Sequence, residues 1–324
     1  MPESETESAR FRAALRRLGS DVLQAYWNLL KLMVPTLLIV KLLDMAGATQ
    51  WIGLLLAPMM ALVGLPEPTG IVLASIVLTN LYTGLALFFV MLPQMDLTVA
   101  QVTVLGTLML MAHSLPVEGA IAKAAGIPWR ATLALRVGGS FLLGAMLDRV
   151  YRAGGWLQQR FEPAWQPDAP AGDLAGWAID QATMLVTIFV VLAGLMVMLK
   201  LMRLIGIERL VHQAMFPLLR LTGISRQAAN VTVIGVTLGI TFGAGLLLRD
   251  VRSGTLSRRD IWLSIGFLGL AHSLIEDTLL ILLIGADLSG ILWARLLFAI
   301  ALIGLLARLP AMRRVLDGDA AVQR

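Results

Sequence analysis

The feature that most constrains the fold is an internal repeat. Two stretches, AHSLPVE at residues 112–118 and AHSLIED at residues 271–277, lie 159 positions apart within long apolar runs. The same offset, without a gap, superimposes further residues of the two halves. These pairs are Lys41 and Lys200, Gly47 and Gly206, Pro58 and Pro217, Gly64 and Gly223, Gly84 and Gly243, Gly126 and Gly285, and Arg136 and Arg295. The pattern indicates one unit that has been duplicated.

The apolar content places this repeat in a membrane. Of 324 residues, 58% are hydrophobic and 15% charged, and the mean hydropathy of +0.80 exceeds that of water-soluble globular proteins. The net charge of +5 comes from basic residues in short loops, which suits membrane topology better than nucleic-acid binding. Because cysteine is absent, disulfides, thiolate metal sites and cysteine nucleophiles are excluded. Residues 1–20 do not read as a removable signal peptide.

Hydropathy divides each half into five apolar segments. They cover residues 22–43, 51–65, 69–92, 99–125 and 129–146 in the first half, and 179–202, 210–221, 227–248, 261–284 and 291–306 in the second. The second segment of each half is short: residues 51–65 give about 22 Å of helix against a hydrocarbon core of about 30 Å. Whether these short segments span the membrane stays open.

The domain boundaries follow from these segments. We expect a cytoplasmic N-terminal segment at residues 1–21, repeats at 22–148 and 179–308, and a cytoplasmic tail at 309–324. Residues 149–178 are rich in proline, glycine and tryptophan, which predicts an extramembrane linker.

The lysine and arginine distribution tests the number of crossings. With an internal N-terminus, five crossings per half give 17 basic residues inside and 5 outside, against 15 and 7 if the short segments do not cross. Five crossings fit better, and an odd number inverts the second repeat. The predicted fold is therefore an all-α polytopic membrane protein with two inverted repeats of about five segments each, as in many secondary transporters. We expect it in the inner (cytoplasmic) membrane, with both termini cytoplasmic.

Broken helices are predicted at the two motifs. Pro116 cannot donate a backbone hydrogen bond, so the helix should break near residues 113–115 and a second half-helix should begin there. Ser114 and Ser273 stand where N-caps belong, and Ser273 with Glu276 matches the capping box. Each motif would then present backbone N–H groups to an anion or polar ligand at membrane depth. A kink without a ligand is the alternative.

The histidines and carboxylates of the motifs are costly at membrane depth, which favours a functional role over a structural one. His113 and His272 are candidate substrate ligands or proton carriers. With Glu118, Glu276 and Asp277 they would hold a divalent cation only if the two motifs meet. Because no short-range spacing such as His-x-x-x-His supports a metal, neither a metal nor a cofactor is predicted.

Other polar residues extend the candidate site. Arg136 and Arg295 either neutralise Glu118 and Asp277 or clamp an anion. The crowded Gly and Thr at the centres of residues 69–92 and 227–248 indicate either tight helix packing or unwound backbone lining a cavity. The further candidate ligands are Asn80, Thr83 and Thr241, and the candidate hinges are Pro116, Gly84, Gly239 and Gly243.

The His-Ser-Leu-Pro-x-Glu and His-Ser-Leu-x-Glu-Asp motifs, each ending a pair of helices with a polar centre, resemble the nucleoside-recognition or Gate domain superfamily. It includes domains of concentrative nucleoside transporters, the ferrous iron permease and the spore maturation proteins A and B. The resemblance covers residues 22–148 and 179–308, so the chain looks like two fused Gate units. The chain lacks the GTPase domain and the cysteine of the iron permease, and neither substrate carries over.

The predicted function is a membrane transporter of a small polar or anionic solute, such as a nucleoside-like compound, an organic anion or a lipid-linked phosphate. Alternating access and proton coupling through the histidines are part of this prediction. The alternatives are a non-transporting scaffold or regulatory protein of envelope physiology and a divalent metal ion permease. No Gly-x-Ser-x-Gly elbow, phosphate-binding loop or His-Glu-x-x-His motif occurs, so no enzyme is predicted. The expected partners are the bilayer, the solute and a coupling proton or cation, without nucleic acid; a homo-oligomer is compatible with the sequence.

Overall fold

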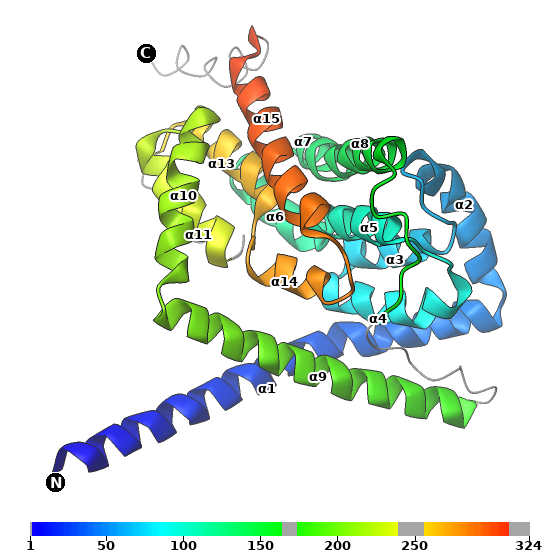
Figure 1. Cartoon of the computed structure of the whole chain (residues 1–324), viewed down its shortest axis with the longest axis horizontal. Coiled ribbons are helices and arrows are strands. Elements are labelled where there is room, and N and C mark those ends of the chain that lie inside the picture. The colour runs from blue at the N-terminus through cyan, green and yellow to red at the C-terminus, as the bar shows by residue number, and fades with distance from the viewer. Residues whose placement is uncertain (1, 164–173, 239–255, 311–324) are drawn as a thin grey trace.

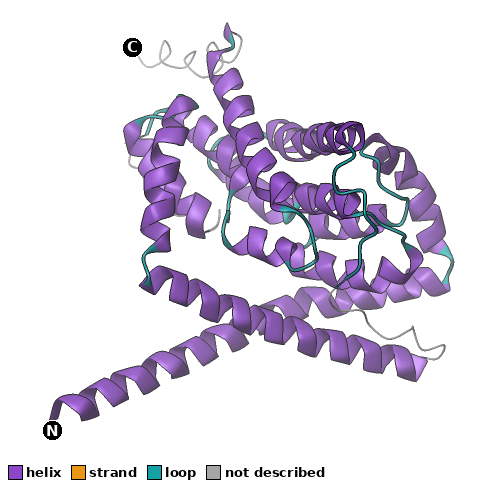
Figure 2. Ribbon diagram, viewed as in Figure 1, coloured by secondary structure: helices purple, strands orange, loops and turns teal. Residues whose placement is uncertain are grey.

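The computed structural model describes residues 2–163, 174–238 and 256–310, and this part of the chain is built from helices without a named strand (Figures 1 and 2). The first half contains α1 (Pro2–Met45), α2 (Ala48–Leu62), α3 (Thr69–Leu78), α4 (Leu81–Met91), η1 (Leu92–Gln94), α5 (Val99–Ala112), α6 (Leu115–Ala124), α7 (Trp129–Leu133), η2 (Ala134–Gly138) and α8 (Gly139–Gly154). The second half contains α9 (Leu174–Leu204), α10 (Ile207–Leu221), α11 (Arg226–Leu238), α13 (Arg258–Ala271), α14 (Glu276–Leu282), η3 (Ser289–Ala294) and α15 (Arg295–Arg308).

Several helical stretches have the length and composition of membrane spans. Within the described residues these are Val99–Ala124, Trp129–Gly154, Leu174–Leu204, Arg258–Leu282 and Ser289–Arg308. Large apolar side chains point outward from them, for example Val186 and Val190 on α9 and Leu297 and Leu305 on α15. Such exposed apolar surface suits lipid and not water. The prediction of an all-α membrane protein is confirmed at this level.

The duplication is visible in the backbone. Eight residues with φ between 45° and 91° form four pairs at the 159-residue offset. These pairs are Gly47 and Gly206, Gly64 and Gly223, Ser114 and Ser273, and Gly126 and Gly285. Because the left-handed region is unfavourable for any residue but glycine, its recurrence at equivalent positions shows that both copies turn the chain in the same way.

Both motifs break their helices, as the sequence predicts. α5 ends at Ala112, His113 is extended and Ser114 is left-handed, and α6 then begins with Pro116 as its second residue, where proline is tolerated. In the second half α13 ends at Ala271, and an extended His272 and a left-handed Ser273 precede α14.

The helices extend beyond the predicted apolar segments in two places. α1 runs without interruption from Pro2 to Met45 and crosses the boundary expected at residue 21. The helices also extend into both ends of the expected linker, since α8 continues to Gly154 and α9 begins at Leu174. A run of apolar residues identifies the part of a helix that crosses the membrane, but it does not show how far the helix continues through polar residues on either side.

The two halves touch at equivalent positions. Where α1 and α9 cross (Figure 1), the Tyr26 hydroxyl donates a 2.9 Å hydrogen bond to the carbonyl of Leu185, its equivalent in the second half. A Cβ added to Gly139 would lie 3.5 Å from Cε1 of its equivalent, Phe298. A residue beside its own equivalent marks the axis that relates two copies of a unit.

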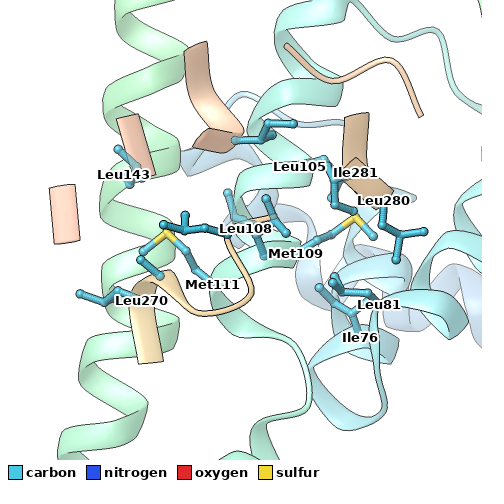
Figure 3. Close-up of a cluster of buried hydrophobic side chains, with 14 of the residues drawn as sticks. Ile76, Leu81, Leu105, Leu108, Met109, Met111, Leu143, Leu270, Leu280 and Ile281 are labelled. Atoms are coloured by element: carbon cyan, nitrogen blue, oxygen red, sulfur yellow. The ribbon is translucent and has the colours of Figure 1, made fainter. Parts of the chain in front are cut away.

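The apolar core joins the halves around α5. Figure 3 shows Met109 and Met111 of α5 among side chains of α13 and α14, including Leu270 and Ile281. All four side chains are almost inaccessible to solvent. This packing fixes the end of α5, and therefore the first motif, against the second half.

Candidate functional site

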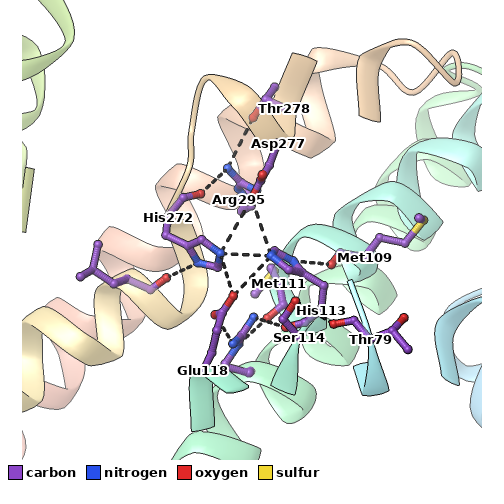
Figure 4. Close-up of polar contacts among 12 residues, drawn as sticks. Thr79, Met109, Met111, His113, Ser114, Glu118, His272, Asp277, Thr278 and Arg295 are labelled. Atoms are coloured by element: carbon purple, nitrogen blue, oxygen red, sulfur yellow. Dashed lines mark hydrogen bonds and ion pairs between the residues drawn. The ribbon is translucent and has the colours of Figure 1, made fainter. Parts of the chain in front are cut away.

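The site consists of four side chains contributed by the two broken helices (Figure 4). The Nε2 atoms of His113 and His272 lie 3.2 Å apart. Glu118 Oε1 lies 3.5 Å from His113 Nε2 and 3.3 Å from His272 Nε2. Asp277 Oδ2 lies 3.7 Å and 3.8 Å from the same two nitrogens. The two motifs therefore meet, and because Glu118 and Asp277 are equivalent residues, the cluster contains each group twice.

Each imidazole is oriented by the helix that it ends. His113 Nδ1 lies 3.1 Å from the carbonyl oxygen of Met109, and His272 Nδ1 lies 2.7 Å from that of Leu268. A carbonyl only accepts hydrogen bonds, so both Nδ1 atoms carry the proton and donate it. In a neutral ring the Nε2 atom then presents a lone pair. Two such lone pairs face each other at 3.2 Å, an arrangement that a proton or a cation between them stabilises.

The two equivalent arginines are both fully buried but differ in their contacts. Arg136 Nη1 pairs with Glu118 Oε2, its Nε donates to the carbonyl of Met111 at 2.9 Å, and its Nη2 donates to the carbonyl of His113 at 2.7 Å. This guanidinium therefore neutralises Glu118, which is one of the two roles that the sequence suggested for Arg136.

Arg295 lacks the equivalent ion pair. Its Nη2 lies 3.5 Å from the His272 carbonyl and 3.4 Å from Thr278 Oγ1. Its Nε and Nη1, and Oδ2 of Asp277, have no hydrogen-bond partner among the described residues. Asp277 is therefore not neutralised directly in this state, and the site is asymmetric although its residues are duplicated.

A short stretch of π-helix lies next to each arginine. η2 (Ala134–Gly138) contains Arg136, and η3 (Ser289–Ala294) ends immediately before Arg295. The wider turn interrupts the regular hydrogen-bond ladder of the helix that carries each arginine, and such π-bulges are frequent at functional sites.

Ser114 occupies the predicted N-cap position of α6 without a capping hydrogen bond from its side chain, whereas Ser273 does not occupy the N-cap position of α14. Ser114 is left-handed and its hydroxyl donates to the carbonyl of Thr79 at 2.9 Å, while its N–H donates to the carbonyl of Ile76 at 2.9 Å. It therefore ties the break in α5–α6 to the break between α3 and α4. In the second half Ile275 occupies the cap position of α14, so Ser273 and Glu276 form no capping box. The left-handed conformation costs about 1–3 kcal/mol at each serine, and in Ser114 it accompanies a hydroxyl that bonds Thr79 and not the first turn of α6.

The polar centre of residues 69–92 contains both features that the sequence left open. The chain unwinds between α3 and α4, where Asn80 Oδ1 accepts hydrogen bonds from the backbone N–H and the hydroxyl of Thr83 at 3.0 and 3.3 Å. Gly84 provides tight packing, because a Cβ there would overlap Cγ2 of Ile76. The corresponding predictions for Gly239, Thr241 and Gly243 lie outside the described residues.

A cavity of about 780 Å³ lies beside the second motif. Tyr82 and Glu276 line it, together with the charged residues Arg17, Asp21, Lys200 and Arg203 of α1 and α9. Among the residues that line it, Glu276 is the neighbour of Asp277 in the chain, and the four residues of the cluster are not part of this lining. Glu276 thus lines this cavity and is not one of the four residues whose side chains meet.

Tyr82 was not among the candidate ligands. Its buried hydroxyl has no hydrogen-bond partner among the described residues, and its ring lines the cavity. An aromatic hydroxyl within the polar centre of an apolar segment was the available signal. Thr278, which contacts Arg295, carried no comparable signal because a threonine in an apolar helix usually bonds the preceding turn.

Comparison with known proteins supports the membrane assignment. The chain is 28% identical over 282 residues to the uncharacterized membrane protein YvoD of Bacillus subtilis (strain 168), an alignment that covers 86% of this chain and 89% of that protein. No family model and no solved structure matches the chain. Because 282 residues exceed the length of either half, the similarity extends into both repeats. The resemblance to the Gate superfamily stays a prediction, whereas the chain itself is a membrane protein with an all-α architecture.

Proposed function

We propose that this protein is a secondary transporter that moves a small polar or anionic solute by alternating access between two inverted repeats. One observation carries the proposal: two broken helices, one from each repeat, bring two histidines and two carboxylates together inside the protein. Ionisable groups at membrane depth usually mark a solute or ion pathway. Binding sites of inverted-repeat transporters lie at the repeat interface and are built from discontinuous helices.

The contacts between equivalent residues support a two-fold relation between the halves. Tyr26 contacts Leu185 and His113 contacts His272, as expected beside a two-fold axis that relates the two halves. With five crossings per repeat, which the distribution of basic residues favours, this axis lies in the membrane plane. Both termini are then cytoplasmic in our proposal.

The asymmetry of the arginines supports alternating access. Glu118 is paired with Arg136, whereas Asp277 and Arg295 form no ion pair with each other, and the cavity is lined by the neighbouring Glu276. An exchange of conformations between the two repeats would pair Asp277 with Arg295 and release Glu118. The solute or coupling ion would then meet one free carboxylate from one side of the membrane and the other carboxylate from the opposite side.

A binding screen followed by transport tests the proposal. Purified full-length protein is melted against panels of nucleosides, organic anions, lipid phosphates and divalent metal chlorides. A ligand present at 100 times its Kd stabilises the folded protein by about 2.7 kcal/mol. Uptake of any hit is then compared in proteoliposomes that contain the wild type, the His113→Ala/His272→Ala double variant or a His212→Ala control.

We expect the double variant to insert normally but to lose uptake, and the control on α10 to retain it. Unchanged uptake in the double variant would contradict the proposal. A wild-type protein that is stabilised by nothing in these panels would favour the second function, a scaffold or regulatory protein of the membrane.

A further inference from the structure

We propose that the four-residue cluster binds one divalent transition-metal ion, with His113 and His272 as nitrogen ligands and Asp277 and Glu118 as oxygen ligands. The donor atoms of His113, His272 and Asp277 all lie within 4.8 Å of one another. The inference goes beyond the proposed transport, since the ion binds whether it is the cargo, the coupling ion or a fixed part of the site.

The distances suit one ion of this kind. Tetrahedral ligands at about 2.0 Å from Zn²⁺ are about 3.3 Å apart. The two Nε2 atoms are separated by 3.2 Å, and Glu118 Oε1 lies 3.3 Å from His272 Nε2. The contacts of Asp277 Oδ2, at 3.7 and 3.8 Å, need a movement of a few tenths of an ångström to close on the ion.

The donor atoms also face a common centre, and hydrogen bonds made by the other atoms of the same side chains hold them there, as in metal sites. Both histidines use Nδ1 for a backbone carbonyl, which leaves the Nε2 lone pairs directed at the shared centre. This second hydrogen bond is the usual partner of a metal-bound histidine. Arg136 holds Glu118 by Oε2 and leaves Oε1 facing the histidines. Imidazole with carboxylate is a donor set for Zn²⁺, Fe²⁺, Co²⁺ or Mn²⁺.

The buried arginines set the charge balance of the site. A divalent ion with Arg136 and Arg295 exceeds the two carboxylates by two positive charges. Removing the charge of Arg295, which has no ion-pair partner, should therefore tighten metal binding. Removing Arg136 would also leave Glu118 without its ion pair. Arg295→Gln is expected to lower the Kd on the order of tenfold, since a unit charge in such surroundings is worth at least that factor.

The test uses the purified full-length wild type and needs no gradient. Titration with CoCl2 should give saturable visible d–d absorption at one ion per chain, and ZnCl2 should displace it. X-ray absorption of the zinc form should show nitrogen and oxygen ligands at about 2.0–2.2 Å with imidazole scattering. The His113→Ala/His272→Ala variant should lose at least 100-fold in affinity, and His212→Ala should match the wild type.

Two results would overturn the metal site. The first is a wild type without saturable binding of Co²⁺ or Zn²⁺, a result that does not depend on how any variant folds. The second is equal affinity in the wild type and a double variant that elutes as a monodisperse helical protein. Neither result bears on the uptake of a different solute, so the metal site and the transport proposal can fail separately.

Discussion

The Nε2 atoms of His113 and His272 lie 3.2 Å apart, although the residues are separated by 159 positions in the sequence. They are the same residue of the duplicated unit, so this contact places the centre of the site between the two copies. Neither repeat forms the cluster alone, because each carboxylate also lies within 4 Å of the histidine of the other repeat.

The two arginines should respond differently to the same substitution. Arg136→Gln leaves Glu118 as a buried, unpaired charge, and breaking a buried ion pair in this way costs about 3–5 kcal/mol. Arg295→Gln removes a buried charge that has two unpartnered nitrogens, so its cost should be far smaller or reversed in sign. Thermal unfolding of the two purified variants measures this difference, and equal losses would refute the asymmetry.

Gly84 should be intolerant of a methyl group. The Cβ of Gly84→Ala would overlap Cγ2 of Ile76 and lie 3.4 Å from Cε of Met109, so we expect a loss of about 1–3 kcal/mol from overpacking. Gly194→Ala on α9 is the matched control, because nothing lies within 4 Å of its added Cβ. The control should gain up to about 1 kcal/mol in helix propensity. Similar melting temperatures for both variants would show that α3 and α4 do not pack as described.

The two left-handed serines provide a second matched pair. Ser273→Gly relieves a φ of 45°, so the apparent melting temperature should rise. Ser114→Gly relieves a φ of 51° but loses the bond to Thr79, worth about 1 kcal/mol, so the net change should be close to zero. A larger gain for Ser114→Gly than for Ser273→Gly would contradict these contacts.

Substitution of Tyr82 should affect the passage of solute through the cavity and should not lower the stability of the protein. Its buried hydroxyl has no partner among the described residues, so Tyr82→Phe removes an unsatisfied polar group and should leave the melting temperature unchanged or raised. If solute passes through the cavity that Tyr82 and Glu276 line, the same variant should change the apparent KM for uptake. A loss of stability without a change in uptake would assign the hydroxyl a structural role.

The sequence predicted most of the architecture because the relevant signals are local. Apolar runs predicted the membrane helices, and Pro116 predicted the break that begins α6. The duplication predicted that a second break would occur at His272, which no proline marks. Because the offset between the two copies is fixed, a break that proline predicts in the first helix is also predicted at the equivalent position of the second helix.

The contacts of the site required three-dimensional information. From the sequence, the hydroxyl of Ser114 could cap the following helix or bond a different helix. In the structure its backbone is left-handed and the hydroxyl donates to the carbonyl of Thr79. Likewise the sequence contains two equivalent arginines whose equivalent carboxylates differ, since Glu118 is one methylene longer than Asp277, and only the structure shows that Arg136 is ion-paired and Arg295 is not. An asymmetry between two related copies depends on contacts across the whole protein and cannot be read from either copy alone.

Single-cysteine labelling tests the central claim, that one unit is inserted twice in opposite orientations around the histidine pair. The chain has no cysteine, and Arg130 in α7 and Ser289 in η3 are equivalent, exposed positions near the start of the helical elements that follow the motifs. Arg130→Cys should react with a membrane-impermeant maleimide only after the membrane is permeabilised, whereas Ser289→Cys should react in intact cells. Labelling of both positions from the same side would show parallel repeats and contradict alternating access between inverted halves.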